Sequence, residues 1–161
     1  MIRSFPPVSD SNSRVLILGS IPGVKSLEAQ QYYAHPMNQF WKILYEIIQK
    51  KQESDYQQKT AFLCQHRIAL WDVIQQCERQ GSSDNQIQNI IPNDFQQFFS
   101  VHPHIQAIFF NGTKARDTFQ KHVGNFVLSR EVCFCLPSTS PANTISYSIK
   151  LNRWRCIIDW L

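Results

Sequence analysis

The chain has 161 residues, and its 16 Lys and Arg against 12 Asp and Glu give a formal charge of +4. This length suits a single domain over residues 1–161 and leaves little room for two. The composition, 43% apolar and 17% charged, excludes a disordered chain, and no apolar run approaches the roughly 18 residues that span a bilayer.

The charge is distributed unevenly along the chain. Residues 1–52 carry a net charge of +3, residues 53–110 of −3 and residues 111–161 of +4. A site built from both ends of the chain would present a basic surface to a phosphate backbone. Ordinary surface scatter explains the same numbers, so the charge permits a nucleic-acid partner without requiring one.

The five cysteines lack Cys-x-x-Cys spacing, so zinc and iron–sulfur sites are not expected. Their odd number argues against a disulfide framework. The first ten residues also lack the apolar core of a secretory signal. We therefore expect a cytoplasmic protein with free thiols.

The first half of the chain combines strand and helix signals. Residues 14–18 (RVLIL) are a short apolar run before a glycine, which is typical of a buried parallel strand. Apolar side chains then recur every three or four residues over 37–51, which predicts a helix. A short helix over 52–65 leads into a second strand over 68–71, and a polar loop follows over 77–85.

The second half continues the alternation. Asn93 or Asp94 is placed to cap a helical segment that contains three phenylalanines. The remaining predicted elements are a strand over 105–110, a helix over 113–122, a strand over 131–136 and a last helix over 144–161. Ile158 belongs to the apolar stripe of that last helix.

Strands that alternate with helices predict an α/β fold, a three-layer αβα sandwich around a central, mainly parallel four-stranded sheet. Ligands of such sheets bind at the carboxyl ends of the strands. We therefore expect the site to form from GSIPG (19–23), ALWDV (69–73), FNGTK (110–114) and LPSTSPAN (136–143).

Three segments carry groups suited to a nucleic acid. GSIPG is either a tight turn whose N–H groups face a ligand or a purely structural turn. LPSTSPAN offers hydroxyls to a phosphate, or it caps a helix. YYAHPMNQFW (32–41) supplies aromatic faces, an imidazole and a carboxamide, although Phe40 and Trp41 suit a helix core better.

In this order the segments resemble the uracil-DNA glycosylase superfamily. GSIPG, SLEAQQYYAHPMNQFW, IALWDV, FNGTKA and LPSTSPAN are similar to its hypoxanthine-DNA (deoxyinosine) glycosylase branch, from about Val15 to Trp160. The resemblance implies a uracil-DNA glycosylase-like fold and a monofunctional enzyme of base excision repair without cofactor or metal. Such an enzyme flips a deaminated base out of DNA and hydrolyses its N-glycosidic bond.

The resemblance also implies which residue is catalytic. The mismatch-specific branch reads GINPG, and its Asn positions the water, but Ile21 stands at that place here. In the deoxyinosine branch the working amide is the Asn of HPxN, so we expect Asn38 to orient the water or contact the base. A helix N-cap is the alternative role for Asn38, and the two are compatible. Leu136 replaces a His that stabilises the leaving uracil in several branches, so hypoxanthine is expected to be preferred over uracil.

Four residues are expected in the base pocket. Tyr33 matches the aromatic side chain that stacks on the flipped base, and the backbone of Ser20 and Ile21 lines the pocket. Asn111 either reads a base edge or satisfies the backbone of an Asn-Gly turn.

The expected DNA-binding residues are Gly23, His35, Ser138, Thr139, Ser140, Pro141 and Ala142. The serines suit phosphates, His35 orients its loop or contacts DNA, and Pro141 or Ala142 is the candidate wedge in the vacated base stack. A monomer suffices for this chemistry, with DNA as the partner. The alternatives are a non-catalytic nucleic-acid binder on the same fold and a mismatch-specific uracil or thymine glycosylase.

Overall fold

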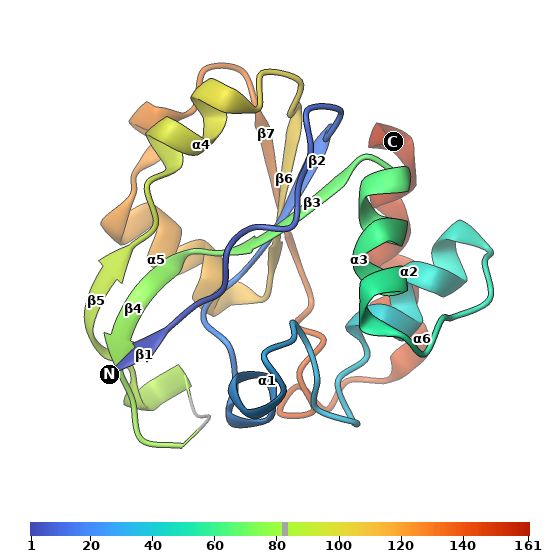
Figure 1. Cartoon of the computed structure of the whole chain (residues 1–161), viewed down its shortest axis with the longest axis horizontal. Coiled ribbons are helices and arrows are strands. Elements are labelled where there is room, and N and C mark those ends of the chain that lie inside the picture. The colour runs from blue at the N-terminus through green and yellow to red at the C-terminus, as the bar shows by residue number, and fades with distance from the viewer. Residues whose placement is uncertain (82–83) are drawn as a thin grey trace.

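A four-stranded parallel sheet forms the centre of the computed structural model, which describes residues 1–81 and 84–161 (Figure 1). Its strands are β2 (Val15–Gly19), β3 (Ile68–Asp72), β6 (Ala107–Asn111) and β7 (Val132–Leu136). The order across the sheet is β3–β2–β6–β7, and each neighbouring pair is parallel. The predicted α/β class and the four predicted strands are confirmed, with shifts of one or two residues at their ends.

Helices cover both faces of this sheet (Figure 1). One face carries α2 (Phe40–Ile48), α3 (Tyr56–Gln65) and α6 (Tyr147–Trp154), and the other carries α4 (Phe95–Val101) and α5 (Thr113–His122). The short α1 (Val24–Ala29) follows β2 beyond the end of the sheet. Among the described residues, no helix has the length and apolar character that crossing a membrane requires.

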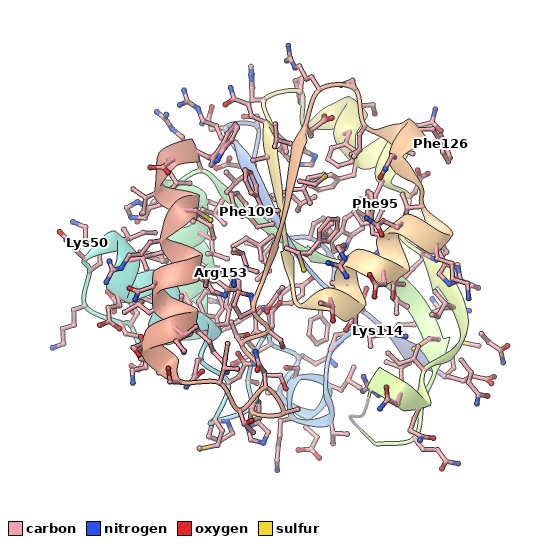
Figure 2. The ribbon with its side chains drawn as sticks, turned by 180° about the vertical axis from the view of Figure 1, so that it is seen from behind. Lys50, Phe95, Phe109, Lys114, Phe126 and Arg153 are labelled. Carbon is pink, nitrogen blue, oxygen red and sulfur yellow. The ribbon has the colours of Figure 1, made fainter. Side chains whose placement is uncertain are left out.

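The sheet divides the core into two layers, and alternate side chains of β2 point into one layer or the other. Val15 and Ile17 pack among the side chains of α2, α3 and α6, whereas Leu16 faces α4 and α5. Successive side chains of a strand point to opposite faces, so an unbroken apolar run fits a strand that is buried on both sides. Figure 2 shows the same division, with Phe109 on the α6 side of the sheet and Phe95 on the other.

The sequence did not predict a second, antiparallel sheet beside the first. Its strands, in the order β1–β4–β5, are β1 (Ile2–Arg3), β4 (Ile74–Glu78) and β5 (Gln88–Pro92). The predicted loop over 77–85 is therefore wrong at its start, and residues 82 and 83 lie outside the described residues. Strand β4 buries only Ile74 and Cys77, so its sequence lacks the strict alternation that marks a strand.

Side-chain hydrogen bonds to the backbone lie at the starts of α4 and α2, and in α4 the N-cap residue itself makes the bond. Asp94 caps α4 as predicted, because its Oδ1 accepts a hydrogen bond from the N–H of Gln97 at 3.0 Å. Helix α2 begins at Phe40 and not at residue 37, since Asn38 forms a turn in which its Oδ1 accepts the N–H of Phe40 at 2.9 Å. Helix α5 spans residues 113–122 as predicted.

The last predicted helix divides into two parts. Helix α6 ends at Trp154, and a 3₁₀ helix continues over Arg155–Trp160. A 3₁₀ helix has about three residues per turn in place of 3.6, so the apolar stripe shifts. Ile157 is consequently buried and Ile158 is 41% exposed, which corrects the predicted stripe. Two further 3₁₀ turns lie at Asp84–Gln86 and Asn125–Val127.

The N-terminal segment is tied to strand β3 and to the segment before α2. Val8 forms an antiparallel bridge with Leu70, with both backbone hydrogen bonds at 2.8 Å. The carbonyl oxygen of Phe5 accepts hydrogen bonds from Trp71 Nε1 at 3.1 Å and from the Tyr32 hydroxyl at 3.2 Å. The segment therefore supports the backbone directly before Tyr33.

Candidate active site

A cavity of about 590 Å³ opens at the carboxyl ends of the parallel strands. The segments after β2 and β7 meet there, close to α1 in Figure 1. Every site residue predicted from the sequence lines this cavity: Ser20, Ile21, Gly23, Tyr33, His35, Asn38, Asn111, Ser138, Thr139, Ser140, Pro141 and Ala142. The cavity therefore brings together both positively charged ends of the sequence, while the individual roles of these residues stay predictions.

Gly19, the last residue of β2, allows two polar side chains to approach the strand closely. A Cβ atom on Gly19 would lie 2.6 Å from Asp72 Oδ1 and 2.8 Å from the Tyr33 hydroxyl. Both distances are shorter than any stable contact, so a larger residue would displace these groups. Glycine at this position permits the carboxylate and the phenol to share one corner of the cavity.

Neighbouring residues fix the Tyr33 side chain, and one face of its ring packs against another aromatic ring. Its backbone has a left-handed φ of 55°, and its ring stacks on Phe40 with centroids 4.1 Å apart. The hydroxyl accepts a hydrogen bond from Asn111 Nδ2 at 3.1 Å. Burial and the nearby carboxylate of Asp72 raise the pKa of Tyr33 above that of an ordinary phenol. The side chain is thus a fixed, neutral aromatic platform.

Asn111 connects β6 to the segment after β7. Its Nδ2 donates to Thr139 Oγ1 at 3.0 Å as well as to Tyr33, and its Oδ1 accepts the N–H of Thr139 at 2.9 Å. Both amide hydrogens are therefore used within the protein, and one lone pair of Oδ1 is left for a ligand. This arrangement is a brace between two strands, and the predicted contact of Asn111 with a base edge stays a prediction.

Asn38 lies in a turn whose backbone is fixed locally. Its N–H donates to the His35 carbonyl at 3.0 Å, and its Oδ1 accepts from Phe40 as described above. His35 Nδ1 accepts the N–H of Met37 at 3.0 Å, while the rest of the exposed imidazole faces the rim. Asn38 Nδ2 has no hydrogen-bond partner among the described residues. Asn38 therefore lies one residue before Gln39, the N-cap residue of α2, and bonds the first residue of the helix from a turn. It also lines the cavity, and its catalytic role stays a prediction.

The loop after β2 is bonded to the segment after β3, and its Ile21 is nearly buried although it lines the cavity. The carbonyls of Gly19 and Ser20 accept the N–H groups of Val73 and Ile74, at 2.8 and 3.1 Å. The Ile21 side chain is 8% exposed and packs with Ile74 and Cys77. The side chain of Ile21 is therefore part of a small core, and the predicted contact of its backbone with the base stays a prediction.

In the loop after β7, serine hydroxyls accept hydrogen bonds from backbone N–H groups of the same loop. Ser138 Oγ accepts the N–H of Ser140, and Ser140 Oγ accepts the N–H of Ala142, both at 3.2 Å. Pro141 and Ala142 are exposed at the rim. Thr139 is 0% exposed and its hydroxyl accepts a hydrogen bond from Asn111, so a contact of this residue with DNA stays a prediction.

Comparison with known protein families shows to which family this chain belongs. The sequence profile of the Uracil DNA glycosylase superfamily matches residues 6–160. The chain belongs to the uracil DNA glycosylase superfamily.

Two relatives of this superfamily member come from species of Methanosarcina. A protein of Methanosarcina acetivorans named hypoxanthine DNA glycosylase is 35% identical over 156 residues, which cover 96% of each chain. A protein of the same name from Methanosarcina barkeri is 40% identical over 114 residues, which cover 70% of this chain and 72% of that one. A solution NMR structure of a candidate uracil DNA glycosylase from M. acetivorans superposes with a TM-score of 0.80 at 35% identity, covering 96% of this chain and 94% of that one.

The sequence analysis missed the acidic residue of this glycosylase-family site. Asp72, at the carboxyl end of β3, is 4% exposed and is the one acidic side chain among the described residues that line the cavity. Asn93 Nδ2 donates to its backbone carbonyl at 2.8 Å, which fixes the end of the strand. The position of Asp72 at a strand end was the available signal, because such ends face the ligand in parallel sheets.

The cavity also receives one basic side chain and no cluster suited to a metal. Lys25 lines it from α1, and its ammonium lies 3.7 Å from Glu28 Oε2. Among residues 1–81 and 84–161, no group of three or more His, Cys, Asp or Glu side chains is placed to hold a metal ion.

Proposed function

We propose that this superfamily member is a monofunctional DNA glycosylase that excises hypoxanthine from deoxyinosine in DNA, with uracil as a secondary substrate. The observation that carries the proposal is one cavity that combines the Tyr33 ring, the Asn38 amide and the buried Asp72 carboxylate. We also propose that residues 1–161 act as a single domain and as a monomer in the cytoplasm. The names of the two Methanosarcina relatives support the choice of base.

The Asp72 carboxylate matches the chemical change that deamination causes. Adenine has a lone pair at N1, whereas hypoxanthine has an N1–H, and uracil gains an N3–H in the same way from cytosine. A carboxylate accepts hydrogen bonds and repels a lone pair, so Asp72 at the cavity wall favours the deaminated base. Guanine shares the N1–H, so this contact separates hypoxanthine from adenine and not from guanine.

Hydrolysis requires a placed water and a stable leaving group. The flipped base stacks on the open face of Tyr33, because the opposite face already packs on Phe40. Asn38 orients the water for attack on the sugar, which develops oxocarbenium character as the bond to the base breaks. The electron pair of that bond leaves with the base, and hydrogen-bond donors at the cavity wall stabilise its negative charge.

Leu136 supports the preference for hypoxanthine. Its side chain is 4% exposed and packs in the core, so it donates no hydrogen bond to the oxygen of a leaving uracil. Loss of one such donor costs about 2.7–4 kcal/mol in a transition state. Uracil is therefore expected to react more slowly than in branches that carry a His at this place.

The decisive experiment incubates the protein with duplexes that contain inosine, uracil, xanthine or an undamaged base, and then cleaves abasic sites with alkali. Inosine duplexes should give the fastest cleavage. Absence of product from every duplex would favour the alternative of a non-catalytic DNA binder. Fastest cleavage of G·U or G·T mismatches would instead favour the mismatch-specific alternative.

Two variants separate the catalytic role of Asn38 from its hydrogen bond to Phe40. Asn38→Ala removes both the amide and this bond, whereas Asn38→Ser keeps an oxygen that accepts the N–H of Phe40. Both should lower the single-turnover rate about 100- to 1,000-fold, as loss of one transition-state contact does, but only the alanine variant should lose stability. Full activity of the serine variant would leave Asn38 a purely structural residue of the turn.

A further inference from the structure

Lys150 is a buried lysine with no role in the chemistry described above. It lies on α6, is 1% exposed, and is the one basic residue among the buried polar residues that the structure describes. Burial lowers the pKa of Lys150, because the charged form loses its hydration. A buried ammonium persists only where hydrogen bonds offset this cost, so the partners of Lys150 matter.

The ammonium is held by two neutral oxygens. Nζ donates to Gln39 Oε1 at 2.9 Å and to the backbone carbonyl of Asn143 at 2.8 Å. No ion pair within the described part of the chain includes Lys150. The two oxygens fix the position of Nζ, and Nζ in turn fixes the distance between the two oxygens.

The two acceptors belong to two segments that both line the site, the Asn38 turn and the loop after β7. Gln39 directly follows Asn38, and its N–H donates to the Thr139 carbonyl at 3.1 Å. Asn143 ends the loop after β7, where its Nδ2 donates to the Ser138 carbonyl at 3.0 Å. Lys150 thus joins the Asn38 turn to the DNA-facing loop from behind, on the side away from solvent.

We propose that Lys150 is a positioning residue, which holds the Asn38 amide and the 138–142 loop at the separation that a flipped nucleotide requires. This inference rests on the proposed glycosylase function. Lys150 acts through Gln39 and Asn143 and does not touch DNA, because its side chain is buried. Misplacing a reacting group by about 1 Å costs about 100-fold in rate, so such a link affects chemistry more than binding.

The test measures single-turnover cleavage of an inosine duplex by Lys150→Met, whose side chain has similar length and no donor. The rate should fall about 10- to 100-fold. Affinity for the duplex should stay within about threefold, and its salt dependence should not change, because each lost phosphate contact would lower the slope of log K against log[salt] by about 0.9. Lys150→Gln keeps a shorter polar group and should give a smaller loss.

Trp154→Phe is the matched control on the same helix. Trp154 Nε1 donates to the Pro137 carbonyl at 2.9 Å, so this variant loses a hydrogen bond to the same loop without breaking the link to Gln39. It should lose stability while its single-turnover rate stays within about threefold of wild type, since one neutral hydrogen bond contributes about 1 kcal/mol to folding. In a Gln39→Met background, Lys150→Met should have much less effect on rate than alone.

Several outcomes would overturn the inference. These are a folded Lys150→Met or Lys150→Gln variant that cleaves at the wild-type rate, an equal rate loss in Trp154→Phe, and full additivity with Gln39→Met. A changed salt slope would assign Lys150 to a phosphate instead. A wild-type protein inert on every damaged duplex would contradict the proposed function, whereas an active wild type with an unaffected lysine variant would contradict only this inference.

Discussion

Two sets of residues that line the cavity differ in how their polar groups are used. In one set, Asn111 gives both amide hydrogens to Tyr33 and Thr139, and Thr139 is fully buried. Asn38 also lines the cavity, and its Nδ2 has no hydrogen-bond partner among the described residues. The two sets of residues thus differ in how many of their donors are already used within the protein, and we expect this difference to separate bracing groups from groups that act on a ligand.

After the Asn38 variants, the largest loss of activity is expected at Asp72, an acidic side chain that lines the same cavity. Asp72→Ala removes the acceptor proposed for the N1–H of hypoxanthine, and a hydrogen bond to a charged group contributes about 1.5–3 kcal/mol. The cleavage rate of inosine duplexes at limiting substrate should fall about 10- to 150-fold. Asp72→Asn keeps an acceptor oxygen and should retain more activity. Equal activity of the alanine variant and wild type would remove Asp72 from base recognition.

An intermediate effect is expected at Tyr33, which combines a working ring with a braced hydroxyl. Tyr33→Leu loses the stacking surface, which is worth about 1–3 kcal/mol per base, so binding to an inosine duplex should weaken about 5- to 150-fold. Tyr33→Phe loses only the contact with Asn111 and should weaken binding about fivefold at most. Equal losses in both variants would show that the hydroxyl matters and the ring face does not.

The smallest catalytic effect is expected at Thr139, within the braced set of residues. Thr139→Val keeps the shape of the side chain and removes the acceptor for Asn111 Nδ2. The free energy of unfolding should fall by about 1–3 kcal/mol, because a buried donor loses its partner, and the cleavage rate should change less than about threefold. Chemical denaturation and single-turnover assays measure the two quantities. A large rate loss at unchanged stability would place Thr139 among the working groups.

Much of the fold could be predicted because its signals are local. The apolar run of β2 and the pattern of α5 match the structure closely. Strand β4 could not be found in the same way, since its IQQCE sequence becomes a strand only by pairing with β1 and β5. Its stability depends on tertiary contacts that the local sequence does not encode.

The functional site also has parts that the sequence could predict and parts that it could not. The cavity-lining loops could be located because they follow strands, and the carboxyl ends of parallel strands meet at one edge. The burial of Asp72 and the hydrogen-bond partners of Lys150 could not be predicted, because they depend on residues far apart in the chain. The two acceptors of Lys150, for example, belong to Gln39 and Asn143. Sequence patterns therefore locate the site, and side-chain contacts are needed to assign its parts.

The attachment of the N-terminal segment has a practical consequence for protein engineering. Phe5 and Val8 bond to β3 and to Tyr32, so the first eight residues support the backbone that carries the stacking ring. A truncated variant that starts after Val8 would keep the whole parallel sheet and still leave Tyr32 without its carbonyl acceptors. Affinity tags and fusion partners are better joined to this chain through a flexible spacer placed before Met1, so that the segment keeps its path.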